Sequence, residues 1–363
     1  MSKTFKFACL LFSTILTTVS LSAQDIYFPA ADEEWAQIDP ATVGWNPELL
    51  ETALDIAGAR NSSGVVILHS GRLMAERYWP LDDAPQRYRN SLSGTDALGR
   101  AIEDVASAQK SVVALLTGMA QERGFLTIDE PVAKYLGPQW SKTTPSQEQS
   151  ITIRHLLTMT SGLADDLSFE EDAGTVWRYN TPAYHLLMRV VAAATGKERN
   201  ELTAVWLTSK LGMENSSWTE REWASADIAT GFSTTARELA RFGLMIQAGG
   251  KWGDEMILAD TEYLADMLSP SQELNPSYGY LWWLNGQAFS RTAGANARRV
   301  DGQLIASAPP DLVAMQGAMD RKLYLVPSLQ LIVTRLGAEG ALEGESFNDA
   351  FWEALMAAAP APK

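Results

Sequence analysis

Apolar residues near both ends of the chain follow patterns that predict β-strands. Residues 64–69 form an almost continuous apolar run, and Ser70-Gly71 then favours a tight turn into a second strand over residues 72–79. Three more strand patterns occur towards the C-terminus, over residues 311–317, 322–326 and 329–335. The strands of one sheet are therefore expected to come from opposite ends of the chain.

Between these strands, apolar positions recur at helical spacing. From Ser107 to Arg123 they fall three or four residues apart, and Gly124 supplies a stop signal. Similar patterns predict further helices at residues 155–157, 184–194, 235–248 and 346–358. Residues 81–100 are polar and are expected to be mostly loop.

Strands at both ends with helices between them predict an α+β fold, in which one antiparallel sheet built from both termini carries an inserted, mostly helical subdomain. With 363 residues and 46% hydrophobic content, the chain can bury a large core. We expect one domain over residues 24–363, with its α/β part at about 24–100 and 300–363 and its helical part at about 101–299.

Net charge and the first residues of the chain limit the partners and the location. A formal net charge of -15 argues against nucleic acid and anionic membranes as partners. Residues 1–6 carry two lysines, residues 7–21 are mostly apolar, and small residues surround a plausible cleavage point near Ala23. We therefore expect a signal peptide over residues 1–23 and a periplasmic or secreted mature protein, because the apolar run is short for a membrane anchor. The one cysteine, Cys9, lies in this segment, so the mature protein is expected to lack disulfides.

Ser107 and Lys110 form the most informative polar pattern in the chain. Three residues apart at the start of a predicted helix, they lie on one helix face, so that the lysine amine can reach the serine hydroxyl. A serine becomes a useful nucleophile when a neighbour takes its proton, and a buried lysine can do this. The Ser-x-x-Lys spacing occurs once, which is about the number expected by chance, so its weight depends on the surrounding sequence.

Other catalytic arrangements have less support in the sequence. The histidines, His69, His155 and His185, lack metal-ligand spacing, and the chain has no Gly-x-Ser-x-Gly elbow, phosphate-binding loop or dinucleotide fingerprint. We therefore expect neither a metal nor an organic cofactor. A Ser-His-Asp triad stays open, because such triads are assembled in space from distant residues.

The sequence around Ser107 resembles a known superfamily. Ser107-Ala108-Gln109-Lys110-Ser111 is similar to the nucleophile motif of the serine β-lactamases and penicillin-binding proteins, above all to the branch with class C β-lactamases, esterases, D-amino-acid peptidases and 6-aminohexanoate-dimer hydrolases. Further matches follow in the family's order, at residues 124–132, 134–136, 151–163 and 235–243. The resemblance spans roughly residues 45–340 and implies the β-lactamase/transpeptidase-like fold.

The resemblance implies a second catalytic element at Tyr179, because the family has Tyr-x-Asn at the start of a helix. Tyr179 takes the tyrosine position, and Thr181 stands where asparagine is frequent, with a hydroxyl that cannot reproduce the two-ended hydrogen bonding of an amide. A phenol acts as a general base only when its pKa, ordinarily about 10, is lowered, and we expect the charge of Lys110 to lower it. The alternative for Tyr179 is an aromatic side chain packed under a turn.

The third element that the resemblance implies is a strand with Lys or His, then Thr or Ser, then Gly, and residues 315–317 match it only at Gly317. Gly317 lets the strand approach the substrate, and the N–H of Ala318 is expected to form the oxyanion hole with that of Ser107. The family's cation, which helps to receive the carboxylate of penicillins and peptides, is missing, and this disfavours β-lactam hydrolysis. Arg321 is a candidate replacement, although a solvated arginine in a hairpin is the favoured interpretation.

Two further stretches have both a structural and a functional interpretation. Residues 278–283 are rich in aromatic side chains, which either wall an apolar pocket or belong to the core. A cluster of acidic residues is expected to lie in a solvated loop, and it comprises Asp165, Asp166, Glu170, Glu171 and Asp172.

Together these features predict an exported serine hydrolase that cleaves a small ester or amide through an acyl-enzyme on Ser107, with Lys110 and Tyr179 sharing the proton as general base. The alternatives are a β-lactamase, D-alanyl carboxypeptidase or D-amino-acid peptidase, and a non-catalytic ligand-binding or sensor protein on the same scaffold. We expect a small-molecule partner, no nucleic acid, and no integral membrane segment in the mature chain.

Overall fold

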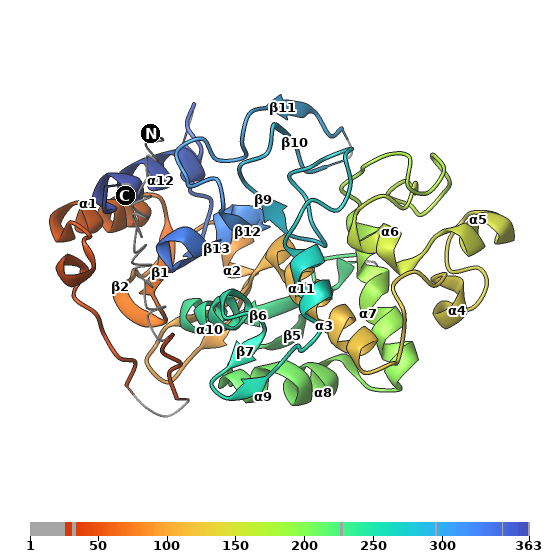
Figure 1. The fold of residues 1–363 in the computed structure, drawn as a ribbon, viewed down its shortest axis with the longest axis horizontal. Helices are drawn as coiled ribbons and strands as arrows, with labels where there is room; N and C mark the ends of the chain where they lie inside the picture. Colours follow the sequence, from red (N-terminus) through yellow and green to blue (C-terminus); the bar gives the residue numbers. More distant parts are fainter. Residues whose placement is uncertain (1–25, 31–33, 226–227, 295, 343, 362–363) are drawn as a thin grey trace, which may run out of the picture.

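The computed structural model describes residues 26–30, 34–225, 228–294, 296–342 and 344–361 (Figure 1). The predicted signal peptide at residues 1–23, with Cys9, lies outside the described residues. Within the described ranges, no helix has both the length and the apolar character needed to cross a membrane.

The main sheet has six antiparallel strands, in the order β2-β1-β14-β13-β12-β9 (Figure 1). The strand bounds are β1 Ser62–His69, β2 Arg72–Tyr78, β9 Trp283–Leu284, β12 Val313–Gly317, β13 Arg321–Val326 and β14 Leu331–Gly337. Strand β1 from the N-terminal part pairs directly with β14 from the C-terminal part, and Val66 lies opposite Thr334. The predicted α+β fold, with one sheet built from both ends of the chain, is confirmed.

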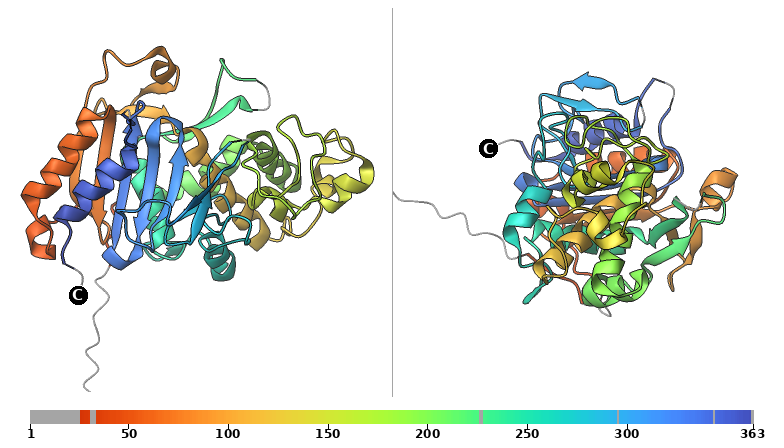
Figure 2. Two further views of the ribbon diagram at one scale, coloured as in Figure 1. Left: turned by 90° about the horizontal axis from the view of Figure 1, so that it is seen from above. Right: turned by 90° about the vertical axis from the view of Figure 1, so that its right-hand side faces the viewer.

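Helices cover both faces of this sheet (Figure 2). On one face α1 (Pro47–Ala59) packs against α12 (Phe347–Ala358), and on the other face α10 (Ala236–Gln247) contacts β1, β13 and β14. Both faces of the central strands β1, β13 and β14 are therefore buried, and buried strands appear in a sequence as near-continuous apolar runs. This is why the apolar pattern predicted these strands.

The side chains of β13 show how close the layers lie. Leu323 and Leu325 point to α10, where a Cβ added at Gly243 would lie 2.6 Å from Cδ1 of Leu323. Tyr324, between them in the strand, packs edge-on against Trp352 of α12. The helix therefore approaches the sheet through a glycine that leaves no space for a larger residue.

The helical part is built around α3 (Gln109–Glu122), which packs against α7, α11 and β12. The other helices are α2 Gln86–Arg89, α4 Ala133–Leu136, α5 Pro145–Ser150, α6 Ile153–Leu157, α7 Thr181–Thr195, α8 Arg199–Thr203, α9 Ser209–Leu211 and α11 Thr261–Met267. A π-helical turn lies at Ala204–Thr208, and short 3-10 turns lie at Pro40–Val43, Ala106–Ala108, Ala318–Asp320 and Pro327–Leu329. The helices predicted near residues 107–123, 155–157, 184–194, 235–248 and 346–358 are all present.

A second antiparallel sheet lies in the middle of the chain, which was predicted to be mostly helical. Its order is β3-β4-β6-β5, with bounds β3 Leu92–Thr95, β4 Ala101–Asp104, β5 Ser217–Glu220 and β6 Thr230–Thr234. Two small hairpins consist of β7 Lys251–Trp252 with β8 Glu255–Met256, and of β10 Phe289–Arg291 with β11 Arg299–Asp301. The boundaries proposed near residues 100 and 300 stay a prediction.

Most of residues 81–100 lie in turns and loops, as expected, but the stretch also contains the short elements α2 and β3, which the sequence did not predict. All four residues of β3 are exposed, so no buried apolar face marks this strand in the sequence. Strand β3 is held instead by backbone pairing with β4, with Thr95 opposite Ala101. Helix α2 has only 4 residues, too few to show a helical period.

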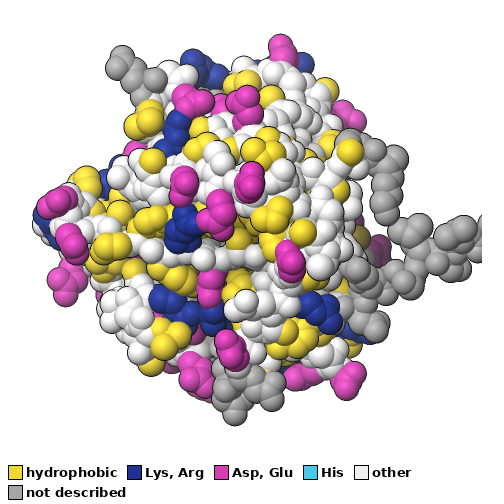
Figure 3. Space-filling view, turned by 90° about the vertical axis from the view of Figure 1, so that its left-hand side faces the viewer, with side chains coloured by type: hydrophobic (Ala, Val, Ile, Leu, Met, Phe, Trp, Pro, Cys, Tyr) yellow, Lys and Arg dark blue, Asp and Glu magenta, His cyan; other side chains and the backbone are white. Residues whose placement is uncertain are grey.

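The side of the molecule formed by α1 and β2 carries charges of both signs (Figure 3). Arg77 of β2 forms ion pairs there with Glu51 and Asp55 of α1. On this side acidic and basic side chains are intermixed rather than gathered into separate patches.

Candidate active site

The turn that carries Ser107 is short and conformationally strained. Ala106–Ala108 form a single 3-10 turn that leads directly into α3. Ala106 has a left-handed backbone, with φ 50°, which costs a non-glycine residue on the order of 1 kcal/mol or more. Oδ1 of Asp104 accepts a hydrogen bond from the N–H of Ala106 at 2.8 Å and holds the turn in this form. The side chain of Ser107 is thereby presented to a pocket.

Lys110 lies one turn further along, on the same face. Its Nζ donates to Oγ of Ser107 at 3.0 Å and to Oγ1 of Thr181 at 3.4 Å. The residue is only 2% exposed, and within the described part of the chain no carboxylate pairs with its amine. Burial, and after it the charge of Arg221, lower the pKa of Lys110 well below its ordinary value. The surroundings therefore favour a neutral amine that can accept a proton.

Tyr179 lies beside both Ser107 and Lys110, immediately before Asn180, which is the N-cap of α7. Asn180 fixes this segment, because its Oδ1 accepts from the N–H of Ala183 and its Nδ2 donates to the carbonyl of Leu163. The phenol hydroxyl shares a hydrogen bond with Ser107. The structure thus brings Ser107, Lys110 and Tyr179 together, as the sequence predicted.

The pKa of Tyr179 shifts in the direction opposite to the one expected. Burial raises it to about 12, against the smaller lowering effect of the hydrogen bond with Ser107. Nζ of Lys110 lies 4.7 Å from the centre of the Tyr179 ring, over its face. Its hydrogen bonds in the described structure go to Ser107 and Thr181, not to the phenol oxygen. At neutral pH Tyr179 is therefore protonated.

The ring of Tyr179 packs against three other aromatic side chains. Its ring stacks on Trp283 at 5.9 Å, and Trp177 and Tyr278 complete the cluster. Trp283 and Tyr278 are buried and lie outside the pocket that contains Ser107. Of the two interpretations of residues 278–283, the structure favours core packing.

The end of β12 touches the Ser107 turn. A Cβ added at Gly317 would lie 2.2 Å from the carbonyl oxygen of Val105 and 3.1 Å from the amide nitrogen of Ala108. Only glycine permits this approach, and Ala318, the next residue, lines the same pocket as Ser107. Gln316, at the position of the family's missing hydroxyl residue, accepts a hydrogen bond from Nζ of Lys322 at 2.9 Å.

The interpretation of Arg321 as a solvated hairpin arginine is wrong. The residue is 1% exposed, and its Nε lies 3.2 Å from Oε2 of Glu103, which is itself buried in β4. Its Nη2 also donates to Oγ of Ser91. Burying the carboxylate of Glu103 without a cationic partner would be costly, and the guanidinium of Arg321 is that partner inside the protein. Arg321 lines the pocket, but its charge is already paired.

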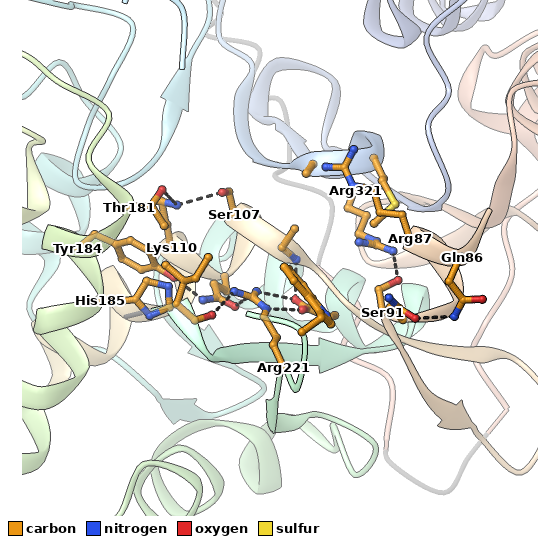
Figure 4. A pocket seen from close by; sticks show the side chains of 18 residues that line it. Gln86, Arg87, Ser91, Ser107, Lys110, Thr181, Tyr184, His185, Arg221 and Arg321 are labelled. Atoms are coloured by element: carbon orange, nitrogen blue, oxygen red, sulfur yellow. Dashed lines mark hydrogen bonds and ion pairs between the residues drawn. The ribbon is translucent and has the colours of Figure 1, made fainter. Parts of the chain in front are cut away.

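The pocket has a volume of about 460 Å³ (Figure 4). In Figure 4 Thr181, Tyr184 and His185 lie on one side of Ser107, and Arg87 and Arg321 lie on the other. Apolar side chains also line the pocket, those of Trp223, Ile228 and Met319. Such a pocket suits a small molecule with an apolar part.

Histidines do not complete a catalytic triad with Ser107 in the described structure. Ser107 has Lys110 and Tyr179 as its side-chain partners. Burial, with the charges of nearby cations, lowers the pKa of His185 to about 3, and this residue packs on the ring of Tyr184. Among the described residues, no group of three or more His, Cys, Asp or Glu side chains is arranged to hold a metal ion.

The acidic cluster predicted to be a solvated loop is exposed, as expected. Asp165 and Glu170 form ion pairs with Arg178, and Asp166 pairs with Lys142. These pairs hold the segment that precedes Tyr179.

Sequence reasoning missed four polar residues beside the site, Asp104, Gln109, Tyr184 and Arg221. Asp104 and Arg221 form a buried ion pair of 2.6 Å although 117 positions separate them. No spacing rule links such residues, because only the pairing of β4, β6 and β5 brings them together. The one signal available in the sequence is Asp104 itself, an acidic residue three positions before Ser107.

The sequence is similar to known proteins along most of its length. The family model described as Beta-lactamase matches residues 48–336. The chain is also 25% identical over 257 residues to an uncharacterized protein of Alkalihalophilus pseudofirmus, a match that covers 64% of this chain and 72% of the other.

Solved structures resemble the whole fold at low sequence identity. A putative beta-lactamase from Bacteroides dorei aligns with a TM-score of 0.64 and 19% identity, over 86% of this chain and 99% of that one. A D-alanine carboxypeptidase from Burkholderia cenocepacia aligns with a TM-score of 0.62 and 17% identity, over 86% and 100%. A putative 6-aminohexanoate-dimer hydrolase from Bacillus anthracis aligns with a TM-score of 0.60 and 16% identity, over 84% and 79%. At these identities the likeness shows the fold alone.

Proposed function

Because the chain belongs to the beta-lactamase family, we propose that it is a serine hydrolase which cleaves a small ester or amide through an acyl-enzyme on Ser107. The observation that carries this proposal is the buried amine of Lys110, 3.0 Å from the Ser107 hydroxyl and beside a pocket for a small molecule. A serine needs such a neighbouring base to attack a carbonyl at neutral pH. Export of the mature protein is part of the proposal and rests on residues 1–23.

The first half-reaction acylates the serine. The hydroxyl proton of Ser107 passes to the neutral amine of Lys110 while Oγ forms a bond to the substrate carbonyl carbon. The N–H groups of Ser107 and Ala318 stabilise the resulting oxyanion, each by roughly 3 kcal/mol. The bond from this carbon to the alcohol or amine then breaks, and the leaving group takes a proton from Tyr179. The ammonium of Lys110 returns a proton to the phenolate through a water molecule in the pocket, so that both groups regain their starting state.

The second half-reaction uses the same groups. Water attacks the acyl carbon and gives a proton to Lys110, and the bond to Oγ of Ser107 breaks as the serine takes that proton back. This division of roles is supported by the two pKa directions, since burial lowers the pKa of Lys110 and raises that of Tyr179 to about 12. Lys110 is the better base and Tyr179 the better proton donor.

The substrate end of the pocket favours a neutral group over a carboxylate. Met315 stands where the family has the cation that helps to receive a carboxylate, and it is a buried apolar side chain. The neighbouring Gln316 accepts a hydrogen bond from Lys322. The charge of Arg321 is paired with Glu103. The apolar side chains of the pocket suit an acyl or alkyl group. These observations support an esterase or small-amide hydrolase, with a β-lactamase or D-alanyl peptidase as the second candidate that the fold permits.

A substrate panel on purified mature protein tests this assignment. The panel contains short-chain p-nitrophenyl esters, a linear amide dimer, a chromogenic cephalosporin and D-alanyl dipeptides. Turnover of the esters or the amide dimer, with slow or absent cephalosporin turnover, is the expected result. Faster turnover of the cephalosporin or the dipeptides would favour the second candidate. Absence of both turnover and acylation would favour a non-catalytic binding protein.

A further inference from the structure

A buried hydrogen-bonded network lies behind the nucleophile, and the proposed mechanism does not use it. Arg221, which follows β5, donates from Nε and Nη2 to the carboxylate of Asp104, at 2.6 and 2.9 Å. The same Nη2 donates to Oε1 of Gln109 at 3.0 Å, and Nε2 of Gln109 donates to the hydroxyl of Tyr184. Figure 4 shows Arg221 below Lys110. The network therefore joins the second sheet to α3 and α7.

Through Asp104 the network reaches the turn that carries Ser107. Asp104 accepts from the N–H of Ala106 at 2.8 Å, and this bond holds the left-handed backbone of Ala106. The side chains of Asp104 and Arg221 are 8% and 9% exposed. A buried carboxylate without its cation would be costly and would adopt another position or a proton. Arg221 is therefore needed to keep Asp104 ionised and in contact with the turn.

The charge on Arg221 also acts on Lys110. The other groups around the Lys110 amine are two hydroxyl groups, two phenol rings and an imidazole. They belong to Ser107 and Thr181, to Tyr179 and Tyr184, and to His185. These groups are neutral at neutral pH, since burial keeps the tyrosines protonated and His185 unprotonated. A fixed positive charge beside a buried amine disfavours its protonation. After burial, Arg221 is the second cause that lowers the pKa of Lys110.

We propose that Arg221 is a positioning residue for the hydrolysis: it fixes the Ser107 turn through Asp104, and its positive charge disfavours protonation of the nearby Lys110 amine. The inference rests on the proposed function of Ser107 and Lys110. A merely structural arginine would support the turn but would not change the pH at which the amine becomes active. The pH dependence of the reaction therefore separates the two roles.

The experiment measures kcat/KM for p-nitrophenyl acetate, and the rate of Ser107 labelling by a fluorophosphonate, as functions of pH. In Arg221→Gln the acid limb of both profiles moves to higher pH, and kcat/KM at neutral pH falls roughly 10- to 100-fold, within the range of lost general-base catalysis. Arg221→Lys retains the charge, so its acid limb stays near that of the wild type, but its activity falls because one ammonium cannot bridge Asp104 and Gln109. Thermal unfolding verifies that each variant is folded.

The matched control is Arg237→Gln, which also removes an arginine from an ion pair, with Glu76, but lies outside the pocket. It leaves both profiles unchanged. An acid limb at the wild-type pH in folded Arg221→Gln would overturn the inference. If this variant does not fold, the double variant Asp104→Asn/Arg221→Gln, which leaves no unpaired carboxylate, is expected to show the same shift. A wild-type protein without Ser107-dependent labelling or hydrolysis would instead overturn the proposed function.

Discussion

Nζ of Lys110 lies 3.0 Å from Oγ of Ser107, and burial lowers the pKa of this amine well below its ordinary value. An amine in this state can take the proton of the nucleophile directly. Tyr179 contacts the same hydroxyl but has its pKa raised to about 12. The pKa values of the two groups beside Ser107 are therefore shifted in opposite directions, and each role in the proposed reaction can be tested separately.

Removal of the amine is expected to abolish acylation. In Lys110→Met, kcat/KM for p-nitrophenyl acetate falls by about 10²- to 10⁴-fold, because Ser107 loses its general base. In Lys110→Arg, kcat/KM falls to the same level, since a guanidinium stays charged and cannot accept the proton. Substantial activity in Lys110→Arg would show that a positive charge, rather than a base, is needed.

The same lysine is expected to destabilise the fold. Because its pKa is lowered in the folded protein, the unfolded chain binds more protons between the folded pKa and the ordinary lysine value of 10.5. The free energy of unfolding of the wild type therefore rises with pH across this window. Lys110→Met is expected to be more stable than the wild type at neutral pH by about 1 to 2 kcal/mol, and the difference shrinks as the pH approaches the ordinary lysine pKa. Urea unfolding at several pH values measures it, with the exposed Lys134→Met as the control that changes little.

The decrease in rate on removing the Tyr179 phenol hydroxyl is expected to depend on the leaving group of the substrate. Tyr179→Phe lowers the rate with alkyl esters and amides by about 10²-fold or more, because their leaving groups need a proton. With p-nitrophenyl esters the loss is under about tenfold, since nitrophenolate leaves without one. Equal losses for both substrate classes would contradict the role of Tyr179 as proton donor.

A side chain at Gly317 is expected to be incompatible with the close contact between β12 and the Ser107 turn. Gly317→Ala places a Cβ 2.2 Å from the carbonyl oxygen of Val105, so the strand moves away and the oxyanion hole opens. We expect kcat to fall by about 10²-fold or more. Gly243→Ala is the matched control, because its Cβ meets Leu323 in the core, which lowers thermal stability but leaves kcat of the folded protein unchanged. Unaltered kcat in Gly317→Ala would remove Ala318 from the oxyanion hole.

Sequence patterns predicted the elements that are buried on both sides and the residues that stand close together in the chain. The strands β1, β13 and β14 appear as apolar runs, and Ser107 and Lys110 share a helix face. The exposed strand β3 has no such pattern, because it is held by backbone pairing with β4 and by a hydrogen bond between the hydroxyls of Ser93 and Ser233 rather than by a buried apolar face.

Charge pairing between distant segments is what the sequence could not predict. Arg321 looked solvated because its partner Glu103 lies 218 positions away and inside the protein. Likewise, Arg221 stands beside Lys110 only through the pairing of strands in the second sheet. The direction of the Tyr179 pKa also depends on burial among Trp177, Trp283 and other aromatic residues, which no local motif shows.

Intact-protein mass spectrometry after fluorophosphonate treatment tests whether Ser107 is the nucleophile. The wild type is expected to gain one adduct per chain, and Ser107→Ala is expected to gain none. Ser111→Ala is the matched control on the same helix, since its Oγ donates to the carbonyl of Leu281 at 2.8 Å, and it is expected to be labelled like the wild type. Full labelling of Ser107→Ala would show that another residue is the nucleophile.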